Sequence, residues 1–248
     1  MSPVDFPAGG YRYLPGVSQY SGGVVAVAGH EIVRVRFRRR LPLAEGFARA
    51  KAIIEAAGRP LAAFCACELR SPAPFTEEGF RQFNAAYVAR LESWGIVRDG
   101  VNPVARSNLC PEIDPPAEPS FHAFCFTTEA ESDAPSFVIS GSGEVPEGQG
   151  NYRDHVIRPG DTSPGGMAEK ARFVLAEMER RMAALGFAWP DTTASQAYTV
   201  FDLFPFFAEE IVRRGAAAHG LTWFYERPPV VGLDFEMDCR GVGREGVV

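Results

Sequence analysis

The chain contains the same order of predicted elements twice. In the first half, a helical, a strand and a second helical pattern occupy residues 42–58, 61–67 and 76–95. In the second half, the same three patterns occupy residues 163–186, 195–203 and a segment that ends at Gly220. A repeated order of elements restricts the possible folds more than any single motif does. We therefore expect two related units, which can divide the roles of one site between them.

Further strand patterns complete each unit. Residues 31–40 alternate, with Val33, Val35 and Phe37 on one face and arginines on the other, as in a half-buried strand. Other strands are expected at residues 24–28, 121–127, 137–141, 221–226 and 230–238, whereas residues 1–23 are expected to be irregular. Each half then has the order strand, strand, helix, strand, helix, strand, strand. This order predicts an α+β fold, with mixed sheets that each carry helices on one face.

Two segments without a helix or strand pattern interrupt this order and are expected to be loops. The acidic stretch 128–135 is typical of a linker, which predicts a first unit at 1–130 and a second at 131–248. Residues 141–167 are rich in Gly and Pro and predict a long loop, and such loops are often functional.

Composition excludes several classes of protein. The net charge of -6 argues against a general nucleic-acid binder, and no apolar run approaches the roughly 20 residues of a membrane helix. No basic segment precedes an apolar stretch at the N-terminus, so no signal peptide is expected. Five scattered cysteines without CxxC spacing favour reduced thiols in the cytoplasm. Four histidines without paired metal spacing predict no bound metal.

Several short motifs occur in a recognisable order. They are Val-Ala-Val-Ala-Gly-His at 25–30, Phe-Asn-Ala-Ala-Tyr at 83–87, Pro-Val-Ala-Arg-Ser at 103–107, Ser140-Gly141, and the alternation of apolar and acidic residues at 233–238. Together they resemble the RidA (YjgF) family over residues 18–127 and again over 136–240. The resemblance implies a chorismate-mutase-like fold and a homotrimer, with sheets inside, helices outside and sites in the clefts between units.

The resemblance also implies an activity. RidA proteins hydrolyse reactive enamines and imines to carbonyl compounds and ammonia, and double-length relatives deaminate aminomuconate-type acids during aromatic breakdown. Arg106 matches the family arginine that binds the substrate carboxylate, and a guanidinium suits that role because it can bind a carboxylate bidentately. No cofactor is expected, because a protonated imine is already electrophilic. Two alternatives stay open: a scavenger of several 2-imino acids, and a non-catalytic protein that binds a small carboxylate metabolite.

The candidate site residues follow from these matches. Arg106, Asn84, Gly29 and Ser107 are expected to bind substrate, and His122, Asn108 and Glu236 are expected to take part in catalysis. The sequence departs from the family at three points. Asn108 stands where a cysteine is common, His122 falls near the position of the family glutamate, and Leu-Thr-Trp-Phe at 221–224 replaces the arginine motif in the second half. Only the first half then keeps the carboxylate anchor, and the second half is either structural or completes the site across an interface.

Each of these residues also has a purely structural interpretation. His122 can be an ordinary structural histidine of a strand, and Arg106 a surface arginine paired with a carboxylate. Glu236, with Asp234 and Asp238, can face solvent or pair with the arginines of residues 34–38 across the sheet. The arginine run at 34–40 can contact RNA, although no aromatic stacking surface interleaves its arginines and the net charge is negative.

Overall fold

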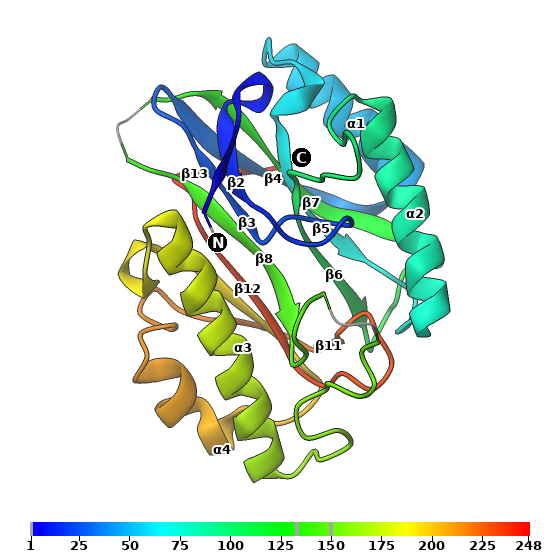
Figure 1. The fold of residues 1–248 in the computed structure, drawn as a ribbon, viewed down its shortest axis with the longest axis vertical. Helices are drawn as coiled ribbons and strands as arrows, with labels where there is room; N and C mark the ends of the chain where they lie inside the picture. Colours follow the sequence, from blue (N-terminus) through cyan, green and yellow to red (C-terminus); the bar gives the residue numbers. More distant parts are fainter. Residues whose placement is uncertain (1, 132–133, 149–150) are drawn as a thin grey trace.

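The computed structural model describes residues 2–131, 134–148 and 151–248. Two mixed sheets lie face to face, and the helices cover their outer sides (Figure 1). Helices α1 (Leu43–Ala56) and α2 (Glu77–Ser93) pack on one sheet, whereas α3 (Pro164–Leu185) and α4 (Phe204–Phe206) pack on the other. The α+β prediction, with helices on one face of each sheet, is thereby confirmed.

The six-stranded sheet has the order β11-β6-β5-β7-β4-β13. Its strands are β4 (His30–Pro42), β5 (Phe64–Arg70), β6 (Ala105–Pro111), β7 (Ser120–Glu129), β11 (Glu226–Arg227) and β13 (Arg244–Val247). The seven-stranded sheet has the order β1-β2-β3-β8-β12-β9-β10. Its strands are β1 (Val4–Phe6), β2 (Tyr11–Leu14), β3 (Gly23–Ala26), β8 (Phe137–Gly143), β9 (Ala194–Tyr198), β10 (Thr222–Phe224) and β12 (Glu236–Gly241).

Each sheet takes strands from both halves of the chain. β3 from the N-terminal segment pairs antiparallel with β8, so the first three strands extend the second half's sheet. In return, β13 pairs parallel with β4, and β11 pairs antiparallel with β6. These exchanges tie the two halves together, and they bring residues that are far apart in sequence to the seam between the sheets.

Three apolar clusters hold the layers together. One lies between α1, α2 and the six-stranded sheet, where Phe47, Phe64 and Phe121 pack at ring-centroid distances of 4.9 to 6.3 Å. A second lies under α3 and includes Met178 and Phe235. A third joins the sheets and is smaller. Because the apolar packing between the sheets is limited, polar side chains occupy much of this seam.

The helix predictions are largely confirmed. Thr76 caps α2 by accepting a hydrogen bond from the Gly79 backbone N–H, as its position before two glutamates indicates. Ser163 caps α3 in the same way, and Gly186 ends α3 with a positive φ of 92°. The last predicted helix is wrong in its extent: it is reduced to α4 and a π-helical stretch, η4 (Phe207–Val212), followed by turns.

Several strand predictions need correction. Residues 1–23 contain β1 and β2, because backbone pairing to β3 orders a segment whose Gly and Pro content indicated irregular structure. The strand expected at 221–226 divides at Tyr225 into two strands of different sheets. The strand expected at 230–238 begins only at Glu236, after a turn in which Gly232 has a φ of 93°. Residues 132 and 133 of the expected linker, and 149 and 150 of the expected loop, lie outside the described residues.

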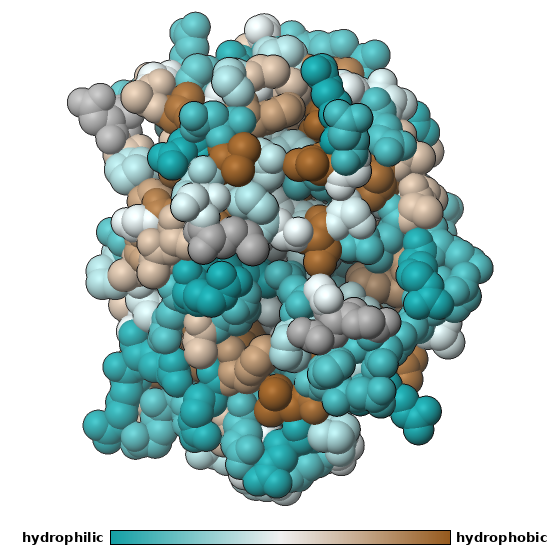
Figure 2. Space-filling model, in the orientation of Figure 1, coloured by the Kyte–Doolittle hydropathy of each residue, from teal (hydrophilic) through white to brown (hydrophobic). Residues whose placement is uncertain are grey.

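The hydropathy of the surface and of the described helices agrees with what the composition predicts. On the face drawn in Figure 2, hydrophilic residues predominate and hydrophobic ones occur singly or in small groups. None of the described helices combines the length and the hydrophobicity that a membrane span needs.

Candidate functional site

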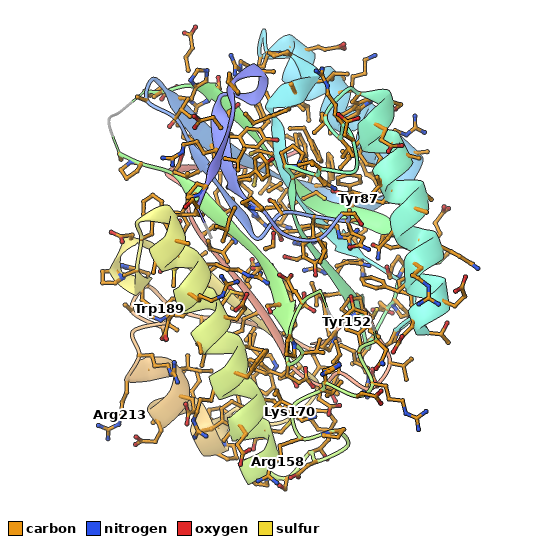
Figure 3. All side chains as sticks on the ribbon, in the orientation of Figure 1. Tyr87, Tyr152, Arg158, Lys170, Trp189 and Arg213 are labelled. Carbon is orange, nitrogen blue, oxygen red and sulfur yellow. The ribbon has the colours of Figure 1, made fainter. Side chains whose placement is uncertain are left out.

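A cavity opens where α2 and β6 of the first half meet β8 and β12 of the second half, on the α2 side of β6. Together with its open mouth, it encloses about 490 Å³ of space that no protein atom occupies. Its polar lining includes Arg106 and Asn108 of β6, Glu236 of β12 and Glu147 of the loop that follows β8. Tyr152, which Figure 3 places between α3 and α2, closes part of the wall. Residues from both halves thus form one site.

Arg106 is a buried cation that forms no ion pair with any of the described residues. Only 3% of the residue is exposed, and its guanidinium carbon lies 4.8 Å from the ring centroid of Tyr87 and 5.1 Å from that of Tyr20. Phe80 and Phe83 complete this aromatic cage. Among the described residues, none accepts a hydrogen bond from the guanidinium, and its Nη1 is buried without a partner. Because an unpaired buried charge is costly, this arrangement is adapted to an anionic ligand.

Glu236 is a buried carboxyl group at the start of β12. Burial, followed by the negative charges of Asp238 and Glu144, raises its pKa well above the usual value of 4.5. Arg106 and Arg181 act in the opposite direction, but they do not cancel the effect of burial. A carboxyl group with a raised pKa can donate a proton near neutral pH and take it back later in a reaction.

Asn108 and Ser107 point to opposite sides of β6. The Asn108 Oδ1 accepts a 3.0 Å hydrogen bond from the Ser71 hydroxyl, and the buried Nδ2 has no partner in the described part of the chain, so it can donate to a ligand. The Ser107 hydroxyl instead donates to the Asp238 carboxylate, which also accepts a 2.9 Å bond from the Tyr198 hydroxyl. Ser107 therefore connects the two sheets next to Arg106 and does not line the cavity.

The remaining predicted residues lie apart from the cavity. Asn84 is buried on α2, beside the aromatic cage, and its Oδ1 has no partner among the described residues. Gly29 forms the turn before β4, with a φ of 79°, and lines a different cavity with His30. The structure therefore brings together Arg106, Asn108 and Glu236, with Asn84 nearby, but it does not bring Gly29 to them.

His122 lies on the opposite face of the six-stranded sheet from Arg106. Neighbouring strand residues face opposite sides, and Phe121 faces the helices, so His122 faces the seam. Its Nε2 is 4.0 Å from the Glu68 carboxylate, which Arg34 already binds at 2.6 Å. Burial and then the charge of Arg70 lower the pKa of His122 to about 3, so it is neutral near pH 7. This position gives His122 no access to a ligand at Arg106.

The acidic residues near Glu236 have partners other than those considered from the sequence. Asp234 binds Lys170 of α3, and Arg34 pairs with Glu68 and Glu245 rather than with β12. Figure 3 shows Lys170 on α3. Lys170 also pairs at 3.3 Å with Glu144, which accepts hydrogen bonds from the Asp234 and Phe235 backbone N–H groups. This buried arrangement fixes the chain immediately before Glu236.

Tyr20, Tyr152 and Glu147 are among the cavity residues that were not found from the sequence. Tyr20 belongs to the segment expected to be irregular, and Tyr152 and Glu147 belong to the long loop. Glu147 forms a 2.9 Å ion pair with the buried Arg181, which also donates to the Ser140 carbonyl at 2.9 Å. The functional character expected of the long loop was the only signal for Tyr152 and Glu147.

Gly141 is expected to be essential for the position of Glu236. A Cβ atom at Gly141 would overlap the Glu236 Oε1, and the Ser107 Cβ would be only 3.3 Å away. We expect Gly141→Ala to displace the Glu236 carboxyl group and to lower kcat by about 10- to 100-fold with little loss of secondary structure. Gly243→Ala is the matched control, since a Cβ there meets no atom within 4 Å. Equal kcat values in the two variants would contradict this role of Gly141.

The chemistry of the cavity indicates a class of protein. The cavity combines a guanidinium that is unpaired among the described residues, an amide donor and a carboxyl group of raised pKa, and this arrangement can bind a small carboxylate and transfer protons. Residues 3–246 match the family model described as 2-aminomuconate deaminase CnbZ, and the chain belongs to this family. The chain is also 50% identical to 2-amino-5-chloromuconate deaminase of Comamonas testosteroni over 247 residues, which are 99% of this chain and 98% of that protein.

Solved structures show a more distant similarity. The E. coli YjgF gene product is 19% identical, with a TM-score of 0.32, over 44% of this chain and 81% of its own. E. coli TdcF with bound serine is 18% identical, with a TM-score of 0.32, over 43% of this chain and 80% of its own. Both matches cover less than half of this chain.

Proposed function

We propose that the protein is a deaminase that hydrolyses an aminomuconate-type enamine to the corresponding carbonyl compound and ammonia. The observation that carries the proposal is the buried Arg106 guanidinium, which no described residue pairs, in the same cavity as the Glu236 carboxyl group of raised pKa. Membership of the 2-aminomuconate deaminase family and the 50% identity to a 2-amino-5-chloromuconate deaminase support it.

Arg106 binds the carboxylate next to the amino-bearing carbon. Its aromatic cage excludes water, so the charge-assisted hydrogen bonds form in a medium of low dielectric and fix the substrate. The Asn108 Nδ2 donates to the substrate or to the attacking water. These contacts place the reacting carbon near Glu236.

Glu236 moves the protons. Its carboxylic acid first protonates the enamine carbon next to the amino-bearing carbon, which converts the enamine into an iminium ion. Water then adds to the iminium carbon while the Glu236 carboxylate takes a proton from it. Glu236 gives this proton to the nitrogen of the resulting carbinolamine, which leaves as ammonia, and the Glu236 carboxylate takes the hydroxyl proton as the C=O bond forms, which restores its carboxylic acid. One water is consumed and one ammonia is released, and the substrate's own nitrogen provides the electrophile.

Ammonia release tests the proposal directly. Freshly generated 2-aminomuconate and imines of simple amino acids are offered separately to the enzyme, and ammonia is measured against the spontaneous rate. We expect saturable release from the muconate and none above background from the simple imines. Release from several 2-imino acids alone indicates a scavenger. No release from any of them contradicts an enzyme of either kind and favours a protein that only binds the metabolite.

We further propose that the chain consists of two RidA-like units, 1–130 and 131–248, and forms a homotrimer in the cytoplasm. Phe204 and Trp223 pack edge to face on the surface, and Phe204 is 77% exposed, which supports a contact with another copy. All five cysteines are free and buried, which favours a reducing compartment. Light scattering tests the trimer: a mass near that of a single 27.0 kDa chain would contradict it.

A further inference from the structure

A bulge in β4 gathers consecutive arginines. β4 and β7 are in register where Arg36 pairs with Ala123, and again where Leu41 pairs with Phe121. Between these pairs lie residues 37–40 on β4 but only His122 on β7. The additional residues of the bulge bring Arg38, Arg39 and Arg40 together opposite His122. Bulges of this kind are often functional, because they redirect side chains toward a site.

These arginines line a second cavity. It encloses about 1060 Å³ with its open mouth, and Arg36 and Arg70 add two more guanidinium groups to its wall. Phe37, Ile113 and Tyr225 provide an apolar part of the lining. The second cavity shares no lining residue with the cavity at Arg106. It is therefore a separate feature, which the proposed deaminase chemistry does not use.

The charges in the second cavity are unbalanced. Within the described parts of the chain, the side chains of Arg36, Arg38 and Arg39 form no ion pair, and Arg40 donates to the Asp114 carbonyl at 2.8 Å. Glu226 is the one acidic residue of the described lining, and it pairs with Arg70 at 2.7 Å. Beneath His122, the Glu68 carboxylate is bound by Arg34. Burial is the main cause of the depressed pKa of His122, and the positive charges of Arg70 and Arg36 lower this pKa further.

We propose that the second cavity binds a small anion with at least two negative charges, of the phosphate or polycarboxylate class. Arginines bind the oxygens of such anions bidentately, and apolar walls strengthen the field between like-charged side chains. The bound anion also relieves the repulsion among the bulge arginines. The net charge of -6 makes this local positive excess selective for a compact anion rather than for a long polyanion.

Calorimetric titration with inorganic pyrophosphate and, separately, with citrate tests the site at low ionic strength. The titrations use Arg106→Ala as the background, so that the guanidinium of the first cavity does not contribute. We expect binding of at least one probe, weakened at least about tenfold by adding Arg38→Ala and Arg39→Ala, because both lose direct contacts to the anion. The matched control adds Arg81→Ala and Arg213→Ala, which remove two exposed arginines elsewhere and are expected to change Kd by less than about twofold. In Figure 3, Arg213 points away from the body of the protein.

The two probes distinguish the source of the anion. Pyrophosphate binding without citrate binding assigns the site to phosphates, and the reverse assigns it to polycarboxylates. Three results overturn the proposal: neither probe binds, the Arg38 and Arg39 variant binds as tightly as its control, or Arg106→Ala alone abolishes binding. A dependence on Arg38 and Arg39 that is seen only with an RNA oligonucleotide overturns it as well. Circular dichroism of each variant confirms that the fold is retained.

Discussion

Arg106→Ala is expected to lower kcat/KM for 2-aminomuconate by about 10²- to 10⁴-fold, because a bidentate guanidinium–carboxylate contact contributes two charge-assisted hydrogen bonds of about 1.5–3 kcal/mol each. Stability is expected to change little. The guanidinium has no ion-pair partner among the described residues, so its removal strands no buried carboxylate. Steady-state kinetics and urea unfolding of the same preparations measure both effects.

Arg70→Ala is a matched control for Arg106→Ala. Arg70 is also buried and also lies beside aromatic rings, but it pairs with Glu226 and lines the second cavity. Its removal leaves Glu226 unpaired, and we expect a loss of about 3–5 kcal/mol in unfolding free energy. Activity is expected to fall only as far as this instability reduces the folded fraction. An Arg106→Ala variant that keeps kcat/KM within about threefold of wild type would refute carboxylate binding by Arg106.

Local patterns in the sequence predicted the helices and strands but not which strands pair with one another. The amphipathic spacing of Phe80, Phe83 and Tyr87 identified α2, because helical periodicity depends on near neighbours alone. The pairing of β3 with β8 and of β13 with β4 depends on contacts between distant segments, which periodicity does not encode. For this reason the sequence could predict two similar halves but not the exchange of strands between their sheets.

The candidate site was predicted in part for the same reason. The motif around Arg106 and the alternation around Glu236 are local signals, and the structure places both residues in one cavity. The sequence could not predict on which face of the sheet the His122 side chain lies, because a shift of one residue in the strand register moves a side chain to the other face. Tyr20 and Tyr152 lie in segments without periodicity, so only the folded chain shows that they line the cavity.

Glu236→Gln is expected to lower kcat by about 10²- to 10⁴-fold, because the amide can neither give nor take the proton that the reaction moves. The pH profile carries the more specific prediction. The proposed first step needs the protonated carboxyl group, so wild-type activity is expected to fall as pH rises through the raised pKa of Glu236. Glu236→Gln should keep a low residual rate without this descending limb.

Glu236→Gln is expected to raise the free energy of unfolding, although it lowers the activity. Because the folded-state pKa of Glu236 is raised, the folded protein holds this proton at a pH at which the unfolded chain has released it. The stabilising contribution of the protonated group is complete below its usual pKa of 4.5 and is lost as pH rises toward the folded-state pKa. We therefore expect Glu236→Gln to gain stability relative to wild type over this window, as measured by urea unfolding at several pH values.

Glu226→Gln is the matched control. It shows what the loss of another buried carboxylate does to stability and to the pH profile. Glu226 is also buried, but its partner Arg70 keeps a full positive charge, and an amide cannot neutralise it. We expect Glu226→Gln to lose stability and to keep the wild-type pH profile of kcat. Two opposite stability changes, with the descending limb lost only in Glu236→Gln, would identify Glu236 as a group held protonated for catalysis at the expense of stability. A Glu236→Gln variant that retained the descending limb would assign the proton transfer to another residue.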